Sequence, residues 1–288
     1  MTEKNDSCYF YHKGTNQHAV IFIHGLNGSE KELGSLPQEL AKLDFTVVIP
    51  KIKGFSNSTE TTPFMVWIDQ IKSIIRDLQV QGFHVSIVGF SMGATLALAV
   101  SVRSREIQNL CLLSPVLEFD GWAIPWYYKL LVIPYYLGLR SWTYHESEPF
   151  GLKNISLRKR VIESMSSAES GFAGANSFTA RSLYASLQLI SFVRKYIGQV
   201  SVNFQIIQSV DDESVSPKTA EFILEKSKSD VRKIIWLGDS YHVITMDNEK
   251  EIVTNEVIYF LKEGLHQQII TNQLLENRFV KAVKDRTN

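Results

Sequence analysis

The stretch Val85-Ser86-Ile87-Val88-Gly89-Phe90-Ser91-Met92-Gly93 decides the fold prediction, because an apolar, strand-like run leads directly into a turn and a helix. Residues 92–103 after it are rich in small apolar residues and predict that helix. The turn reads Gly-x-Ser-x-Gly, which is typical of a sharp strand-to-helix turn that exposes a serine hydroxyl. Its two glycines let strand and helix approach closely, and the helix N-terminus aims N–H groups at the serine. Ser91 is therefore a candidate nucleophile, and the alternative is a turn serine that only caps the helix.

Strand-like runs and helical segments alternate on both sides of this turn. Apolar runs predict strands over residues 18–23, 45–49, 85–88, 110–113, 202–208 and 232–237. Apolar residues at three- and four-residue spacing predict helices over residues 30–43, 65–79, 92–103, 181–197, 217–228 and 250–263. Because the strands are apolar without alternation, we expect an α/β fold with a mostly parallel sheet covered by helices on both faces.

Residues 116–200 differ from the rest, since they are rich in aromatic residues, Ser and Gly and show no strand alternation. They separate two strands of the expected sheet and predict a mainly helical cap, inserted into a core of residues 1–115 and 201–264. Residues 265–288 predict a C-terminal helix or tail.

The cap contains an aromatic-rich run over residues 122–139, long enough to be considered as a membrane span. Its prolines, Lys129 and tyrosine hydroxyls argue against one. Trp122, Trp126 and Tyr127 in this run are candidates for lining an apolar substrate pocket. The alternatives are a peripheral contact with lipid and simple packing of the cap on the core.

The composition excludes several classes of protein. Thirty Lys and Arg balance thirty Asp and Glu in 288 residues, so no electrostatic argument favours a nucleic-acid partner. Cys8 and Cys111 cannot form a disulfide framework, no Cys-x-x-Cys pair suggests zinc, and Cys111 in its apolar run predicts a buried thiol. The polar residues 1–7 lack the features of a secretory signal, so we expect a cytoplasmic protein. The oligomeric state stays open.

A loop after the first of these strands offers a second signal. His24-Gly25-Leu26-Asn27-Gly28 follows the run that ends at Ile23. The backbone N–H of Leu26 can stabilise a developing oxyanion together with the N–H of Met92, the residue after the candidate nucleophile. The side chain of His24 is expected to hold this loop in place.

A serine hydroxyl needs a base, and in this architecture the acid and then the histidine follow the serine along the chain. His242 comes directly after the strand at 232–237, where catalytic groups of open α/β sheets lie, whereas His145 and His266 have no such position. Three adjacent carboxylates follow the strand at 202–208, and only one of them can face the imidazole. Spacing alone leaves the choice between Asp211 and Asp212 open and predicts that the others face solvent or cap the next helix.

Together these residues resemble the α/β-hydrolase superfamily, especially its bacterial carboxylesterase and monoacylglycerol-lipase-like branch. Ser240-Tyr241-His242-Val243-Ile244-Thr245-Met246-Asp247 is similar to the histidine motif of that branch, and its acid motif, Asp-x-x-Val/Ile, selects Asp212. Lys53-Gly54-Phe55-Ser56 departs from the Lys-Gly-His-Gly that is frequent there, so the resemblance does not extend to the substrate specificity of that branch.

The resemblance implies a triad of Ser91, Asp212 and His242 that cleaves carboxylic esters with an apolar acyl or aryl group through an acyl-enzyme, without metal or cofactor. The same triad also serves thioesterases, acyltransferases, peptidases and C–C hydrolases, because the fold hosts many reactions. A non-catalytic binding protein of this fold is the remaining alternative.

Overall fold

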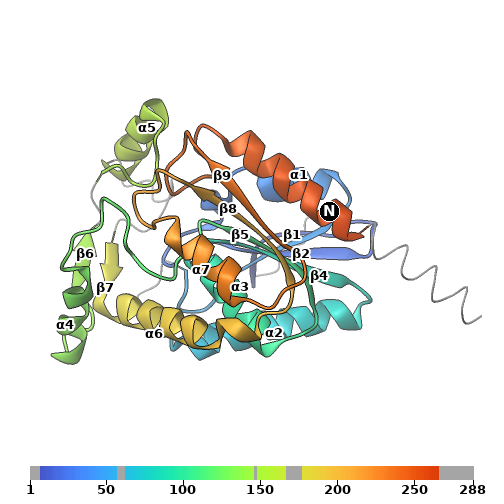
Figure 1. Cartoon of the computed structure of the whole chain (residues 1–288), viewed down its shortest axis with the longest axis horizontal. Helices are drawn as coiled ribbons and strands as arrows, with labels where there is room; N and C mark the ends of the chain where they lie inside the picture. Colours follow the sequence, from blue (N-terminus) through green and yellow to red (C-terminus); the bar gives the residue numbers. More distant parts are fainter. Residues whose placement is uncertain (1–6, 57–61, 146–147, 167–176, 266–288) are drawn as a thin grey trace, which may run out of the picture.

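The computed structural model describes residues 7–56, 62–145, 148–166 and 177–265. Its centre is a seven-stranded sheet in the order β1-β3-β2-β4-β5-β8-β9 (Figure 1). The strands are β1 (Cys8–His12), β2 (His18–Ile23), β3 (Thr46–Pro50), β4 (His84–Phe90), β5 (Ile107–Leu113), β8 (Asn203–Ser209) and β9 (Arg232–Leu237). All neighbours pair in parallel except β1, which runs antiparallel to β3. The predicted α/β fold with a mostly parallel sheet is confirmed.

Helices cover both faces of this sheet (Figure 1). One face carries α2 (Phe64–Val80), α3 (Met92–Arg103), α6 (Ala180–Tyr196) and α7 (Lys218–Lys226). The other carries α1 (Leu36–Lys42) and the helix over residues 250–265. Strand β2 shows why both layers form: Ile21 and Ile23 belong to one buried cluster, while Val20 and Phe22 belong to the other. A strand that is apolar on both sides is stable only between two layers.

The chain between β5 and β8 forms most of the left end of Figure 1, and we call residues 116–200 the cap. It contains η2 (Tyr128–Val132), α4 (Ile133–Tyr136), β6 (Thr143–His145), α5 (Ile155–Ser166), β7 (Ser177–Thr179), α6 and η3 (Ile197–Gln199). The pairing of β6 with β7 was not predicted, because strands this short leave no alternation in the sequence. Leu189, Ile190 and Val193 of α6 join the main core, so this helix also anchors the cap.

The prediction of a single helix over residues 30–43 is wrong. The chain forms the 3-10 turn η1 (Glu30–Leu33), breaks at Gly34 and resumes as α1. Gly34 has a φ of 59°, and a Cβ there would lie 2.5 Å from the Thr245 carbonyl oxygen, so a contact distant in sequence forces the break.

Strand β1 was not predicted, and each of its residues is only partly buried. The expected C-terminal helix or tail falls almost entirely on residues 266–288, outside the described ranges. Among the described helices, none combines the length and the apolar character that crossing a membrane would need.

Candidate active site

The carboxyl ends of the parallel strands meet at one edge of the sheet. Backbone pairing sets Ile23 of β2 beside Gly89 of β4, and Phe90 of β4 beside Leu113 of β5. Strands β8 and β9 end level with each other in the same way. The segments that follow β2, β4, β8 and β9 contain Leu26, Ser91, Met92, Asp212 and His242, so these residues, far apart in the chain, come together here.

The turn at Ser91 has the geometry that its glycines predict. Ser91 has φ 56° and ψ −123°, and its side chain makes no capping hydrogen bond to α3. A Cβ on Gly89 would lie 2.5 Å from the Gly93 carbonyl oxygen, and one on Gly93 would lie 2.2 Å from the carbonyl oxygen of Ile23. Such a strained turn persists only where its surroundings enforce it, and here it presents the hydroxyl instead of capping the helix.

His242 contacts both Ser91 and Asp212. Its Nε2 lies 2.9 Å from the Ser91 Oγ, and its Nδ1 lies 2.9 and 3.1 Å from the two carboxylate oxygens of Asp212. Asp212 is buried and also accepts hydrogen bonds from the backbone N–H groups of Ser214 and Val215. Asp211 points away and binds the Lys153 ammonium at 2.8 Å. Of the two aspartates that spacing left open, Asp212 is therefore the one that faces the imidazole.

Glu213 is the third carboxylate, and it neither faces solvent nor caps α7, so both predicted alternatives are wrong for it. It is buried, its Oε2 accepts the backbone N–H of His242 at 3.0 Å, and its Oε1 lies 3.1 Å from the Ser214 hydroxyl. Burial raises the pKa of Glu213; the charged form of His242 opposes this shift, and the Asp212 carboxylate adds to it. The buried position of Glu213 was not predicted, because no local sequence pattern shows that the side chain after Asp212 turns inward.

Two more carboxylates hold the loop that carries His242. Asp247 accepts the backbone N–H groups of Tyr241, Lys153 and Asn154 at 2.7–2.9 Å. Glu249 accepts the N–H groups of Gly238 and Asp239. These charge-assisted hydrogen bonds fix the loop and tie it to the chain segment before α5. The motif that suggested the resemblance includes Asp247, whereas no sequence pattern indicated a role for Glu249.

The two backbone donors expected at the site are available. Within the described part of the chain, neither the Leu26 nor the Met92 N–H donates to a protein acceptor. By contrast, the N–H groups of Gly25, Asn27 and Gly28 all donate to protein oxygens. The N–H of Met92 also opens α3, whose dipole favours negative charge at that end.

His24 holds this loop, as expected. It is fully buried, its Nδ1 lies 2.7 Å from the Gly25 carbonyl oxygen and its Nε2 lies 3.2 Å from the Ser56 hydroxyl. Burial lowers the pKa of His24 to about 4, against the opposing effect of the hydrogen bond to Gly25. The ring is therefore neutral near pH 7, and because a carbonyl only accepts, its proton is on Nδ1.

Neither a reactive cysteine nor a metal cluster is found among the described residues of the site. Cys111 is fully buried, as predicted, and burial raises the pKa of its thiol. No group of three or more His, Cys, Asp and Glu side chains within the described ranges is arranged to hold a metal ion. The groups that the site itself presents are a hydroxyl, an imidazole, carboxylates and two backbone donors.

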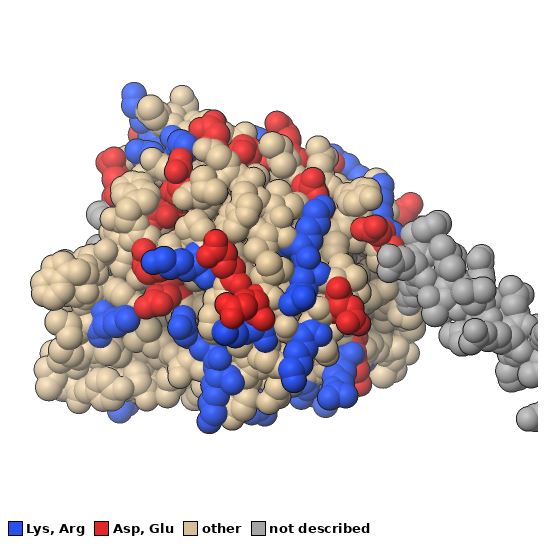
Figure 2. Space-filling view, viewed as in Figure 1, with Lys and Arg blue, Asp and Glu red and all other residues tan. Residues whose placement is uncertain are grey.

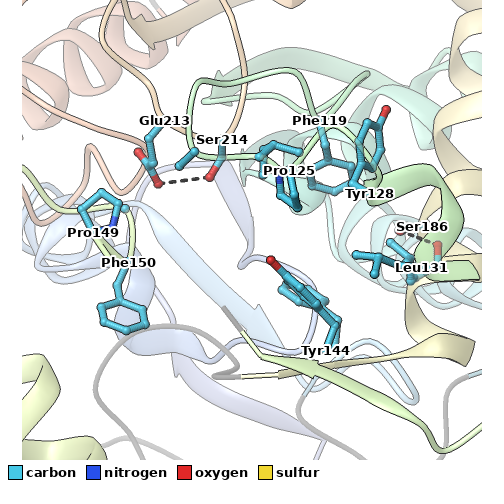
Figure 3. A pocket seen from close by; sticks show the side chains of 15 residues that line it. Phe119, Pro125, Tyr128, Leu131, Tyr144, Pro149, Phe150, Ser186, Glu213 and Ser214 are labelled. Atoms are coloured by element: carbon cyan, nitrogen blue, oxygen red, sulfur yellow. Dashed lines mark hydrogen bonds between the residues drawn. The ribbon is translucent and has the colours of Figure 1, made fainter. Parts of the chain in front are cut away.

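A mostly apolar cavity lies under the cap and reaches Glu213, the residue after Asp212. Its lining consists of Phe119, Ala123, Ile124, Pro125, Tyr128, Leu131, Tyr144, Pro149, Phe150, Gly151, Phe178, Leu183, Ser186, Glu213 and Ser214. Figure 3 shows Glu213 and Ser214 at one end, close in the chain to Asp212, and Leu131 and Ser186 at the other. The Gly151 carbonyl accepts the N–H of Val243, which places the cavity next to the His242 loop.

Trp122, Trp126 and Tyr127 do not line this cavity. They are 64%, 88% and 42% exposed, and Trp122 packs its ring against Tyr241. These three residues of the aromatic run over residues 122–139 were predicted to line a pocket, but their side chains lie outside the cavity. The run still contributes to the lining through Ala123, Ile124, Pro125, Tyr128 and Leu131. The other lining residues come from Phe119 and from short segments between residues 144 and 214, which no local sequence signal groups together.

Comparison with known proteins identifies the family. Residues 14–249 match the family described as "Serine aminopeptidase, S33". The chain belongs to this family. The predicted membership of the α/β-hydrolase superfamily, among its esterase- and lipase-like serine hydrolases, is confirmed.

Relatives of known activity and solved structures agree with this family. The chain is 23% identical to a thermostable monoacylglycerol lipase of a Bacillus species over 84% of this chain and 89% of that protein. It is 22% identical to a carboxylesterase of Bacillus subtilis over 88% of this chain and 96% of that protein. The structure of Paleococcus ferrophilus monoacylglycerol lipase matches with a TM-score of 0.75 at 18% identity, covering 88% and 97% of the two chains. Monoglyceride lipase of Saccharomyces cerevisiae, in complex with a substrate analogue, matches with a TM-score of 0.71 at 15% identity over 92% and 94%.

Proposed function

We propose that this serine hydrolase cleaves carboxylic esters through an acyl-enzyme formed on Ser91. The observation that carries the proposal is the chain of contacts from Ser91 Oγ through the imidazole of His242 to the Asp212 carboxylate. Oγ attacks the ester carbonyl carbon while His242 Nε2 takes its proton, and Asp212 stabilises the imidazolium. The N–H groups of Leu26 and Met92 then stabilise the tetrahedral oxyanion. His242 returns the proton to the leaving alcohol, and water releases the acid by the same steps.

The cavity under the cap supports a substrate with an apolar acyl or aryl group. Aromatic and aliphatic side chains make up most of its lining. Its polar end is lined by Glu213, the residue after Asp212, and by Ser214. An ester carbonyl at Ser91 can therefore direct its acyl group away from water and into the cavity. This substrate class agrees with the relatives, which include a monoacylglycerol lipase and a carboxylesterase.

The outer face of the cap supports a peripheral contact with lipid. Between residues 122 and 142 the exposed large apolar side chains of the cap are those of Trp122, Trp126, Tyr127, Leu130, Ile133, Tyr136, Leu137, Leu139 and Trp142. In Figure 2 the corresponding end of the molecule carries few charged side chains. An exposed apolar surface of this kind marks an interaction site, and Trp and Tyr suit the boundary between lipid and water. We expect the protein to take sparingly soluble esters from aggregates through this face.

Replacing Ser91 by Ala tests the proposal. The variant should keep the fold and thermal stability of the parent but lose hydrolysis of p-nitrophenyl esters, and a fluorophosphonate probe should label the parent and not the variant. Unchanged turnover in the variant would remove Ser91 as the nucleophile. Absence of both labelling and turnover in the parent would favour a non-catalytic binding protein of this fold.

The reaction within this class is decided by a substrate panel. The same groups can act on thioesters, amides or carbon–carbon bonds, or transfer the acyl group to another acceptor. Matched acyl esters, thioesters and anilides, assayed with and without an added alcohol, would rank these reactions by kcat/KM. We expect oxygen esters to rank first.

A further inference from the structure

Glu32 is a buried carboxylate beside the proposed site that the steps above do not use. It lies in η1 with only 5% of its surface exposed. Its Oε2 accepts the backbone N–H of Gly25 at 2.8 Å. The carbonyl of Gly25 accepts hydrogen bonds from His24 Nδ1 and from the N–H of Gly28. Since that carbonyl and the Leu26 N–H belong to one planar peptide, bonds on both sides of Gly25 fix the direction of the Leu26 N–H.

The loop from Gly25 to Gly28 is fitted closely around this carboxylate. A Cβ on Gly28 would lie 2.3 Å from both carboxylate oxygens, and a Cβ on Gly25 would lie 2.9 Å from Oε2. Glycine at these two positions therefore makes room for the Glu32 side chain. A buried carboxylate is costly unless it is hydrogen-bonded, and the bond to the Gly25 N–H offsets part of that cost.

The backbone of Glu32 reaches the loop that carries His242. Its carbonyl accepts a hydrogen bond from the hydroxyl of Thr245, a buried residue that follows His242 in the same loop. The neighbouring Gly34 packs against the Thr245 carbonyl, as described above. Glu32 thus contacts the loop from Gly25 to Gly28 through its side chain and the loop that carries His242 through its main chain.

We propose that Glu32 is a positioning residue that holds the Leu26 N–H in the direction needed to bind the oxyanion. The inference rests on the proposed function, because it assumes ester turnover at Ser91. Its consequence is specific: without the carboxylate the loop loosens, and stabilisation of the tetrahedral intermediate falls. Binding of the substrate in the cap cavity is unaffected, so kcat falls while KM stays nearly constant.

Substitutions in the whole 288-residue chain test this role. Removing one oxyanion donor typically lowers kcat by about 100- to 1000-fold, and a donor that is only loosened should cost less, so Glu32→Ala is expected to lower kcat by about 10- to 100-fold. Affinity for an alkyl boronic acid, which forms a tetrahedral anion on a reactive serine, should fall by a similar factor. Glu32→Gln keeps an acceptor oxygen for the Gly25 N–H and should restore most of both. Glu30→Ala removes a partly exposed carboxylate from the same turn and is the matched control, expected to match the parent.

Gly28→Ala provides an independent route to the same defect, since the new methyl group displaces the carboxylate. It should lower kcat in the parent but add little in Glu32→Ala, because both changes remove one interaction. If Glu32→Ala does not fold, Glu32→Asp, which is one methylene shorter, is expected to show the loss of kcat.

A folded Glu32→Ala or Glu32→Asp variant whose kcat and boronate affinity stay within about twofold of the parent would overturn the inference alone. Since one kcal/mol is already about a fivefold change, such a result would leave no measurable positioning effect. A parent protein whose Ser91 reacts with neither ester nor fluorophosphonate would instead overturn the proposed function, and this inference with it.

Discussion

His242 Nε2 lies 2.9 Å from Ser91 Oγ although 151 positions separate the two residues in sequence. The backbone N–H and the backbone carbonyl of His242 both form hydrogen bonds with residues of other segments. Its N–H donates to Glu213, and its carbonyl accepts from the Ser114 hydroxyl at 2.8 Å. Glu213 follows β8 and Ser114 follows β5, so the ends of neighbouring strands set the position of the imidazole. The distance between His242 and Ser91 therefore depends on the sheet as a whole.

Asp212→Asn is expected to lower kcat by about 10⁴-fold without unfolding the protein, the loss known for the equivalent change in serine proteases. An amide at this position favours the wrong tautomer of His242, with the proton on the nitrogen that should accept from Ser91. Asp211→Asn is the matched control, because that carboxylate binds Lys153 instead of the imidazole. Steady-state kinetics on a p-nitrophenyl ester would measure both. Equal losses in the two variants would contradict the assignment of Asp212.

Glu213→Leu should lower kcat by about 10- to 100-fold, because it leaves the buried N–H of His242 without an acceptor, at a cost of about 1–3 kcal/mol. Glu213→Gln keeps an acceptor oxygen and should retain most of the activity. The comparison separates the need for an acceptor from the need for a charge. A Glu213→Leu variant with the kcat of the parent would show that this hydrogen bond does not position the imidazole.

The groups at the strand ends could be predicted because their requirements are local. A serine between two glycines, placed after a buried strand, leaves few steric alternatives, and His242 and Asp212 follow strands that the sequence also shows. The order of these strands along the chain then predicts one shared edge.

The remaining features depend on contacts that are distant in sequence. The contact of Gly34 with Thr245 breaks the predicted helix over residues 30–43, and the inward turn of Glu213 depends on the backbone of His242. The aromatic-rich run over residues 122–139 does line part of the cavity, but its large aromatic residue Trp126, which was predicted to line it, is exposed. Leu183 and Phe178 line the cavity from a segment whose apolar composition is ordinary. Hydrophobic periodicity reports which residues are buried, but it does not report against what they pack.

Leu183→Trp is expected to fill part of the cavity under the cap, since Leu183 lines it. Long acyl esters should lose at least tenfold in kcat/KM, while acetyl and butyryl esters keep most of theirs, because only long acyl groups need the occupied space. A chain-length series of p-nitrophenyl esters measures the shift. An unchanged profile would mean that the acyl group lies elsewhere.

Trp126→Ala is the control for that experiment and also tests the outer face of the cap. Trp126 is 88% exposed and does not line the cavity, so the variant should hydrolyse soluble short esters like the parent. It should lose activity on a monoacylglycerol presented in vesicles, together with part of its binding to them in a sedimentation assay. Equal vesicle binding by variant and parent would argue against a lipid contact at this face.

The free energy of unfolding should fall as the pH drops from about 6.5 to about 4, because of buried histidines away from the proposed triad. Burial, reinforced by the nearby His84, lowers the pKa of His18 from 6.5 to about 4. Between these values the unfolded chain binds a proton that the folded protein does not, so acid favours unfolding, by up to about 3 kcal/mol per group. His24, with a pKa also lowered to about 4, adds to the effect.

His18→Gln isolates one of these two contributions. The variant removes the titrating ring from a position 2.8 Å from the Ser86 hydroxyl, outside the proposed site. Urea unfolding at intervals between pH 7.5 and pH 4.5 should therefore show a shallower loss of stability in the variant than in the parent. The two proteins are compared by this slope, because the substitution also changes packing at pH 7.5, where His18 is neutral in both folded and unfolded chains. Identical slopes would mean that His18 already accepts a proton in the folded protein at its ordinary pKa, and that burial in β2 does not keep the ring neutral.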